Sequence, residues 1–154
     1  MKITKEGLRL KGHWTIDIRE NGKLVKRIEK DNQLTNAYRD SVLNQLKGNS
    51  FTSLDILYLA VGTGSVQAQP TDTILDAEIF RSVPTQKSIV GNYMQTIWVI
   101  PNDLANEHLR EIGVFAGEAT STPDSGTMLS RINIDIDKTS SMEITFIRRD
   151  YVII

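Results

Sequence analysis

The spacing of hydrophobic residues near the start of the sequence is that of a β-hairpin. Residues 8–18 place large apolar side chains at alternate positions, the pattern of a strand buried on one face. Asn21 and Gly22 follow, and this pair favours a tight turn because both residues tolerate a positive φ. Residues 24–28 are predicted to form the returning strand.

From residue 31 onward the apolar spacing becomes that of a helix. Apolar side chains recur at every fourth position, and Gly48 follows as a stop signal. The members of this stripe are Leu34, Tyr38, Val42 and Leu46. We expect one amphipathic helix over residues 31–47 that packs this stripe on a sheet. Leu46→Ala would then cost roughly 2–5 kcal/mol of unfolding free energy.

The rest of the chain shows strand patterns separated by polar turns. Residues 54–61 form a dense apolar run, typical of a strand covered on both faces, whereas the type of the element at 74–80 stays open. Five further candidate strands are residues 83–90, 93–100, 109–116, 128–136 and 142–154. About eight strands and one helix predict an all-β fold, a jelly-roll-like antiparallel β-sandwich formed as a single domain by residues 1–154.

Composition is that of an ordinary globular domain. The 154 residues are 40% hydrophobic and 24% charged, which suffices to bury a core without a metal or crosslink. The absence of cysteine excludes a thiolate nucleophile and a sulfur-based zinc site, and we expect no cofactor. No segment approaches the ~20 apolar residues of a membrane span, and residues 1–6 are too charged for a secretion signal. We therefore expect synthesis in the cytoplasm and no membrane contact.

Charge is balanced overall but uneven along the chain. Eighteen Lys and Arg against 19 Asp and Glu give a net charge of −1, which offers no basic surface for nucleic acid. Residues 1–30 hold nine basic and four acidic residues (+5), whereas residues 31–154 hold nine and fifteen (−6). We favour solvated strand faces as the explanation; electrostatic steering of one copy against the next is the alternative.

Gly62 and Gly64 follow a predicted buried strand, where glycines can let backbone amides close on a phosphate. No Gly-Lys-Ser/Thr motif and no third glycine follows at the required spacing, and the next residues predict a loop instead of a helix. We therefore expect a structural turn without a nucleotide, with a positive φ in at least one of the two glycines.

Residues with catalytic chemistry are scattered. Ser65 lies outside a Gly-x-Ser-x-Gly motif, and nothing in the sequence brings His13 and His108 together. We therefore expect no Ser-His-Asp triad and no catalytic residue.

Two further groups of side chains have a functional and a structural interpretation. Asp135 and Asp137 share one face of a predicted strand, and with Asp124 or Glu143 they could bind Ca²⁺. We favour a solvated face and expect no metal site. Three aromatic residues could form a sugar-binding platform, but their apolar neighbours favour core packing. They are Trp14, Tyr93 and Trp98.

One ordered series of short motifs goes beyond composition. In chain order these motifs are Leu34-Thr-Asn-Ala37, Val61-Gly-Thr-Gly64, Pro70-Thr-Asp-Thr73 with Leu75, Glu78 and Arg81, then Arg110-Glu-Ile-Gly-Val-Phe115 and Met128-Leu-Ser-Arg131. Over residues 30–150 the series resembles small structural proteins of tailed bacteriophages, the tail-fibre or collar-fibre-like and baseplate-associated components. Tyr38, Val114 and Ser130 depart from the usual residues of that pattern, at the level of packing.

The resemblance implies a non-enzymatic virion component that assembles with copies of itself and with other virion proteins. Its place in the tail, baseplate, collar or fibre attachment stays open. The alternative is a carbohydrate-binding, receptor-recognition module of a phage. Arg110 and Glu111 are candidates for a fixed ion pair with Arg81 or Glu78.

The end of the sequence is apolar at every position over residues 151–154, after a polar break at 148–150. An ending of this kind needs cover on both faces. Two explanations stay open, a central strand of the same chain or a contact between copies, and we favour the second. The expected interface residues are Arg148, Arg149, Tyr151, Val152, Ile153 and Ile154.

Overall fold

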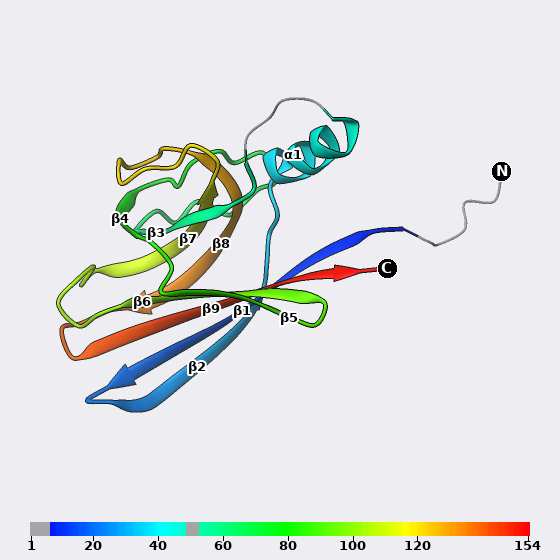
Figure 1. Cartoon of the computed structure of the whole chain (residues 1–154). Coiled ribbons are helices and arrows are strands. Elements are labelled where there is room, and N and C mark those ends of the chain that lie inside the picture. Colours follow the sequence, from blue (N-terminus) through cyan, green and yellow to red (C-terminus); the bar gives the residue numbers. More distant parts are fainter. Residues whose placement is uncertain (1–6, 49–52) are drawn as a thin grey trace.

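The computed structural model describes residues 7–48 and 53–154, which form two antiparallel sheets facing each other and one helix (Figure 1). The first sheet contains, in spatial order, β2 (Lys23–Asp31), β1 (Arg9–Glu20), β9 (Met142–Ile153), β6 (Tyr93–Ile100) and β5 (Gln86–Val90). The second contains β4 (Glu78–Ser82), β3 (Ile56–Gly62), β7 (His108–Ala116) and β8 (Thr127–Asp137). The prediction of an all-β antiparallel sandwich with one helix is confirmed. The segment 74–80, whose type stayed open from sequence, enters the strand β4 at Glu78.

The β1–β2 hairpin forms where the sequence predicts it. Asn21 and Gly22 have φ of 50° and 78°, the left-handed conformation that a two-residue hairpin turn requires. The alternating residues of β1 then turn one apolar face inward, toward the other sheet. This hairpin places the long exposed strand β2 at one edge of the first sheet.

The core lies between the sheets and is centred on aromatic side chains. Trp14 of β1 stacks on Trp98 of β6 with ring centroids 5.9 Å apart, and Phe146 of β9 meets Trp14 edge-on at 6.5 Å. Leu59 and Ile112 contribute apolar side chains from the second sheet. Each large side chain buried in this way stabilises the fold by about 1.5–3 kcal/mol.

The helix α1 (Asn36–Lys47) starts later than predicted, because β2 extends to Asp31 and Thr35 provides the cap. The Thr35 hydroxyl accepts a hydrogen bond from the Tyr38 N–H at 3.2 Å and donates one to the Met128 carbonyl at 2.6 Å. Gly48 closes the helix at a φ of 82°. The cap therefore both starts the helix and attaches it to β8.

The predicted packing stripe of the helix is only partly correct. Leu34, Tyr38 and Val42 are half-buried, whereas Leu46 is 75% exposed. The expectation that Leu46 packs on the sheet is wrong, so the condition for a loss of roughly 2–5 kcal/mol on Leu46→Ala is not met. A loss below about 0.5 kcal/mol, typical of surface positions, is expected instead. Among the described residues no helix is long and apolar enough to cross a membrane.

Candidate functional site

The most enclosed charged group of the second sheet is the carboxylate of Glu111 on β7, whose side chain is 0% exposed. It accepts hydrogen bonds from the backbone N–H groups of Gly64, Asp76 and Ala77 at 3.1, 2.9 and 2.7 Å. Arg131 on β8 donates two more, from Nε at 3.1 Å and Nη2 at 2.9 Å. The carboxylate is therefore fully compensated inside the fold.

Arg131 extends this network to the loop between β3 and β4. Its Nη1 pairs with Asp72 at 2.7 Å, and its Nη2 donates to the Val66 carbonyl at 2.7 Å. Asn133, on the same strand, accepts from the Ala68 N–H at 2.7 Å and donates to the Val66 carbonyl at 2.9 Å. Side chains of β7 and β8 thus fix the loop 63–77 at both of its ends.

Gly62 and Gly64 are required by packing, for a physical reason other than the predicted positive φ. Neither glycine has a positive φ, so that prediction is wrong. A Cβ at Gly62 would overlap the Ala77 carbonyl oxygen and Glu111, and a Cβ at Gly64 would overlap Asp76 and Glu111. The glycines are required because backbone approaches backbone and carboxylate closely.

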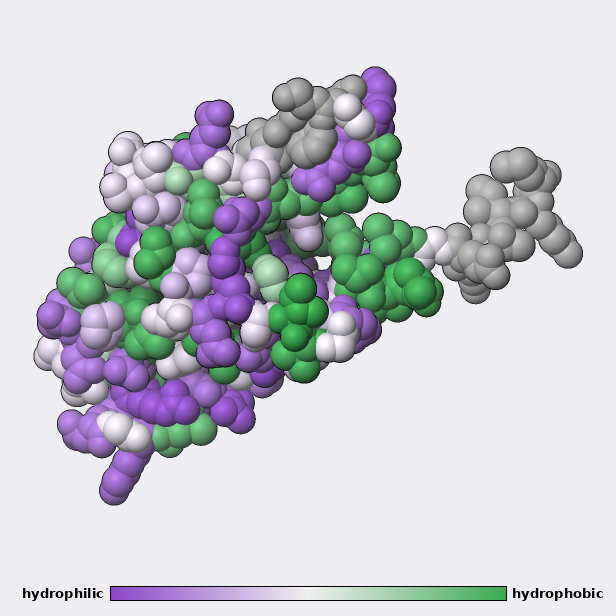
Figure 2. Space-filling view, viewed as in Figure 1, coloured by the Kyte–Doolittle hydropathy of each residue, from purple (hydrophilic) through white to green (hydrophobic). Residues whose placement is uncertain are grey.

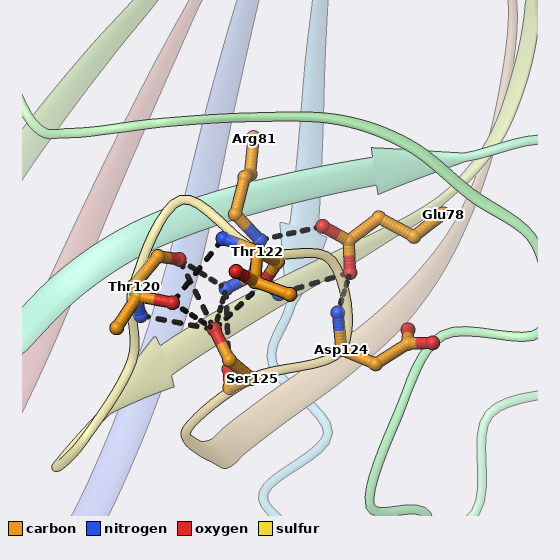
Figure 3. A network of polar contacts seen from close by, with 6 residues as sticks. All are labelled: Glu78, Arg81, Thr120, Thr122, Asp124 and Ser125. Carbon is orange, nitrogen blue, oxygen red and sulfur yellow. Dashed lines mark hydrogen bonds and ion pairs between the residues drawn. The ribbon is translucent and has the colours of Figure 1, made fainter.

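A second buried network joins β4 to the loop between β7 and β8 (Figure 3). Arg81 forms a bidentate pair with Glu78, with Nε–Oε1 and Nη2–Oε2 distances of 2.5 and 2.9 Å. Its Nη1 donates to the carbonyls of Thr120 and Ser125 at 2.9 and 3.1 Å. The guanidinium lies over the Phe115 ring, 4.6 Å from its centroid. This arginine therefore positions the loop 117–126.

The expected partners of Glu111 were wrong. Glu111 pairs with Arg131, Arg81 pairs with Glu78, and Arg110 lies beside His108 instead. The pairing of β7 with β8 shifts register between Leu109 and Glu111, which leaves Arg110 exposed, whereas Glu111 is buried beneath the loop 63–77 on the face opposite to the core residue Ile112. The Arg131 partner depends on strand pairing that the local sequence does not specify.

The carboxylates considered for Ca²⁺ lie in separate surroundings. Asp124 is close to Glu78, and burial together with the Glu78 charge raises the pKa of the Asp124 carboxyl. Asp135 bonds to His108, while Asp137 is exposed. Within residues 7–48 and 53–154, no group of three or more His, Asp or Glu side chains is placed to share a metal ion.

An open polar cleft of about 540 Å³ lies against β7 and β8. The His108 Nε2 hydrogen-bonds to Asp135, and the Arg110 Nη2 lies 3.4 Å from the His108 Nδ1. The hydrogen bond from His108 lowers the pKa of the Asp135 carboxyl. The polar residues that line the cleft are Ser65, Gln67, His108, Arg110, Asn133 and Asp135.

Neither histidine makes a serine contact in the part of the chain that the structure describes. His13 lies on the β1–β2 hairpin, where it contacts Glu29 at 2.6 Å and Asp31 at 3.2 Å. Ser65 lines the same cleft as His108, but no hydrogen bond joins the two side chains among the described residues. These contacts do not assemble a Ser-His-Asp triad.

The three aromatic residues do not form a common surface. Trp14 and Trp98 are buried and stacked in the core, which confirms the prediction of core packing for both. Tyr93 is half-buried and packs on Tyr151 with ring centroids 4.9 Å apart. A sugar platform made of the three side chains is therefore excluded.

The C-terminal strand lies in the middle of its sheet. Tyr151 of β9 pairs with Lys11 of β1 and with Tyr93 of β6. The side chain of Arg148 is fully buried and donates to Ser130 at 2.7 Å, so it presents no surface to a partner. Residues beyond Tyr151 do reach the surface, and so do parts of Arg149. The exposed apolar ones are Val152, Ile153 and Ile154.

Fold and site together define the class of this protein as a two-sheet antiparallel β-sandwich whose long loops are fixed by buried ion pairs. No family model, no curated protein and no solved structure matches the chain.

Proposed function

We propose that this chain is a non-enzymatic structural component of a bacteriophage virion. It would occupy the tail, baseplate, collar or fibre attachment and assemble with copies of itself and with neighbouring virion proteins. One observation supports the proposal above the others: the motifs that carry the resemblance to phage structural proteins meet in the two buried networks. The residues concerned are Gly64, Asp72, Glu78, Arg81, Glu111 and Arg131.

The chemistry of these networks suits a structural role. The Glu111 carboxylate is surrounded by donors, and Arg81 is held by Glu78 and by two backbone carbonyls. Charged side chains whose hydrogen-bonding positions are all occupied by the protein are not free to act on a substrate. They hold long loops in one conformation instead. A loop that is already ordered loses little entropy when a neighbouring subunit binds it.

The proposal is tested on particles produced by the genome that encodes the chain. Mass spectrometry of gradient-purified virions should detect the chain at a fixed ratio to the other structural proteins. Antibody against the exposed part of loop 117–126 should label one position on each particle in electron micrographs. Finding the chain only in the soluble fraction, with complete and infectious particles lacking it, would overturn the proposal.

A carbohydrate-binding module is the second candidate, because the polar cleft beside His108 offers several hydrogen-bonding side chains. It would act through Arg110, Asp135 and Gln67 without an aromatic platform. A glycan array tests this candidate, with Arg110→Ala as the variant that should lose binding. Arg39→Ala, an exposed arginine of α1, is the matched control. Absence of any bound glycan would leave only the structural role.

A further inference from the structure

The two ends of the sandwich carry opposite charge. The connections β1–β2, β6–β7 and β8–β9 meet at one end, whereas β1 begins, β9 ends and α1 lies at the other (Figure 1). Besides the cations Lys23, Lys138 and Arg19, of which Lys138 is buried and Arg19 pairs with Asp17, the first, acidic end carries five carboxylates without an ion pair among the described residues. They are Glu20, Asp103, Glu107, Asp137 and Glu143. The second, basic end carries Arg9, Lys11 and Lys47, all exposed, against the exposed carboxylate of Asp31, which contacts His13.

The basic end also contains an apolar groove of about 320 Å³ between α1 and the start of β1. Leu43 and Leu46 line it from the helix, and both are more than half exposed. Leu10 of β1 and Leu8, which comes just before that strand, line its other side. Figure 2 shows hydrophobic surface on the helix and on the projecting strand ends, facing each other across a hollow. An exposed apolar patch of this kind marks a site of protein contact.

The acidic end presents an apolar side chain that matches this groove. Leu104, in the β6–β7 loop, is 41% exposed and lies between Asp103 and Glu107. The buried Lys138 holds the loop, because its Nζ donates to three oxygens of it and its backbone N–H donates to the Glu107 carbonyl at 3.1 Å. The three acceptors of Nζ are the carbonyls of Pro101 and Asn102 and the side-chain oxygen of Asn106.

We propose that copies of this chain associate head to tail, with Leu104 of one copy seated in the leucine-lined groove of the next. Asp103 and Glu107 then face the cations of the basic end, which include Arg9 and Lys11. Contact between two basic ends would instead oppose like charges. A contact between unlike surfaces repeats, and so it builds a ring or an open stack. The inference rests on the proposed function and specifies the partner surface for self-assembly.

Cysteine crosslinking tests the contact directly, because the chain contains no cysteine of its own. The double variant Leu104→Cys with Leu43→Cys should give a ladder of multimers on oxidation, reversed by reductant. Both positions are exposed, so the variant should fold, which circular dichroism verifies. Each single variant should stay monomeric on oxidation. No ladder in the folded double variant overturns the proposal, and so does a crosslinked dimer of Leu43→Cys alone, which would indicate contact between two basic ends.

Charge reversal gives a second test that needs no crosslink. Asp103→Lys with Glu107→Lys, and separately Arg9→Glu with Lys11→Glu, should each lower the mass measured by light scattering to that of the monomer. A mixture of the two variants should associate again, because each new charge then meets its opposite. Association of the wild-type chain should weaken as salt rises. Unchanged association of either variant alone would contradict the proposal.

Two matched surface substitutions distinguish the groove contact from non-specific hydrophobic association. Leu104→Arg should abolish association, whereas Val83→Arg, at an exposed apolar residue of the β4–β5 connection, should leave it unchanged. A wild-type chain that remains monomeric up to its solubility limit overturns the head-to-tail contact. Detection of the same chain in purified virions would then leave the proposed function standing.

Discussion

The buried ion pairs of the second sheet are enclosed on both sides, whereas the ion pairs of the β1–β2 hairpin have at least one partner that is partly exposed. Glu111 with Arg131, and Glu78 with Arg81, have side chains exposed by no more than 4%. On the hairpin, Asp17 is equally enclosed, but its partner Arg27 is 52% exposed. Water therefore solvates one half of the hairpin pair, whereas the pairs of the second sheet depend on the protein for every hydrogen bond.

This difference determines what each pair can stabilise. The buried pairs hold backbone: Glu111 binds three N–H groups of the β3–β4 loop, and Arg81 binds two carbonyls of the β7–β8 loop. The Asp17–Arg27 pair joins only two side chains across neighbouring strands. Breaking a buried pair leaves a charge without solvent or partner, so its cost should be several times larger.

The largest effect is expected for Glu111→Gln. The amide keeps the size of the side chain but leaves Arg131 buried with a weaker partner, and its NH₂ group cannot accept the backbone hydrogen bonds. We expect a loss of about 3–5 kcal/mol of unfolding free energy, measured by urea denaturation. Glu118→Gln, at an exposed residue of the following loop, is the control and should change stability by no more than about 0.5 kcal/mol.

A loss below about 1 kcal/mol for Glu111→Gln would place this pair in the range of surface ion pairs. The contrast between the buried and exposed pairs would then fail.

Arg81→Lys should have an intermediate effect. The ammonium keeps the charge but cannot form both hydrogen bonds to Glu78 or cover the Phe115 ring as the planar guanidinium does. We expect a loss of about 1–3 kcal/mol. Hydrogen exchange should also accelerate in loop 117–126, while the β1–β2 hairpin keeps its protection. Arg39→Lys in the exposed pair with Asp40 is the matched control and should alter neither quantity.

The hairpin and the buried networks also differ in how far the sequence predicts them. Alternation in β1 and the Asn21-Gly22 pair are local signals, and they predicted the hairpin because its geometry depends on neighbouring residues. Glu111 and Arg131 both belong to the ordered series of motifs in the sequence, but their contact depends on the pairing of β7 with β8.

The glycines and the helix show the same limit of sequence reasoning. The requirement for Gly64 follows from the proximity of Asp76 and Glu111, which are distant from it in sequence. The exposure of Leu46 depends on where the sheet ends beneath α1, and helical periodicity carries no information about that. Local patterns therefore predicted the elements, while the close contacts between them required the folded chain.

A smaller, pH-dependent effect is expected for Asp17→Asn. The hydrogen bond from Arg27 lowers the pKa of the Asp17 carboxyl below its ordinary value of 3.8. A lowered carboxyl pKa stabilises the folded state above that ordinary value, and this contribution is lost as pH falls through the folded pKa. Because Arg27 is half exposed, the variant should lose only up to about 1 kcal/mol at neutral pH.

The difference between wild type and Asp17→Asn should therefore shrink in thermal unfolding measured below about pH 4. A difference that stays constant between neutral and acid pH would show that the lost stability comes from packing and not from the ion pair. Arg19, which lies 3.5 Å from the same carboxylate, provides the related control variant Arg19→Gln.

The smallest effect should have the opposite sign, for Asp124→Asn. Asp124 has a φ of 64°, a conformation that asparagine adopts readily, and its backbone N–H to Glu78 is unaffected by the change. Burial and the Glu78 charge raise the pKa of the Asp124 carboxyl, so the folded state favours its protonated form and is destabilised once it ionises. Because Asp124 is exposed and water screens its charge, removing the charge should add no more than about 0.5 kcal/mol at neutral pH. This gain should disappear below about pH 3.8, where the wild-type carboxyl is protonated in both folded and unfolded states.

The variant Asp124→Ala separates the effect of the charge from that of the backbone conformation, because it also removes the charge but places a residue poorly suited to positive φ in the loop. If alanine stabilises as much as asparagine, charge alone explains the gain; if asparagine gives no gain at neutral pH, the carboxylates of Asp124 and Glu78 do not repel each other in the folded chain.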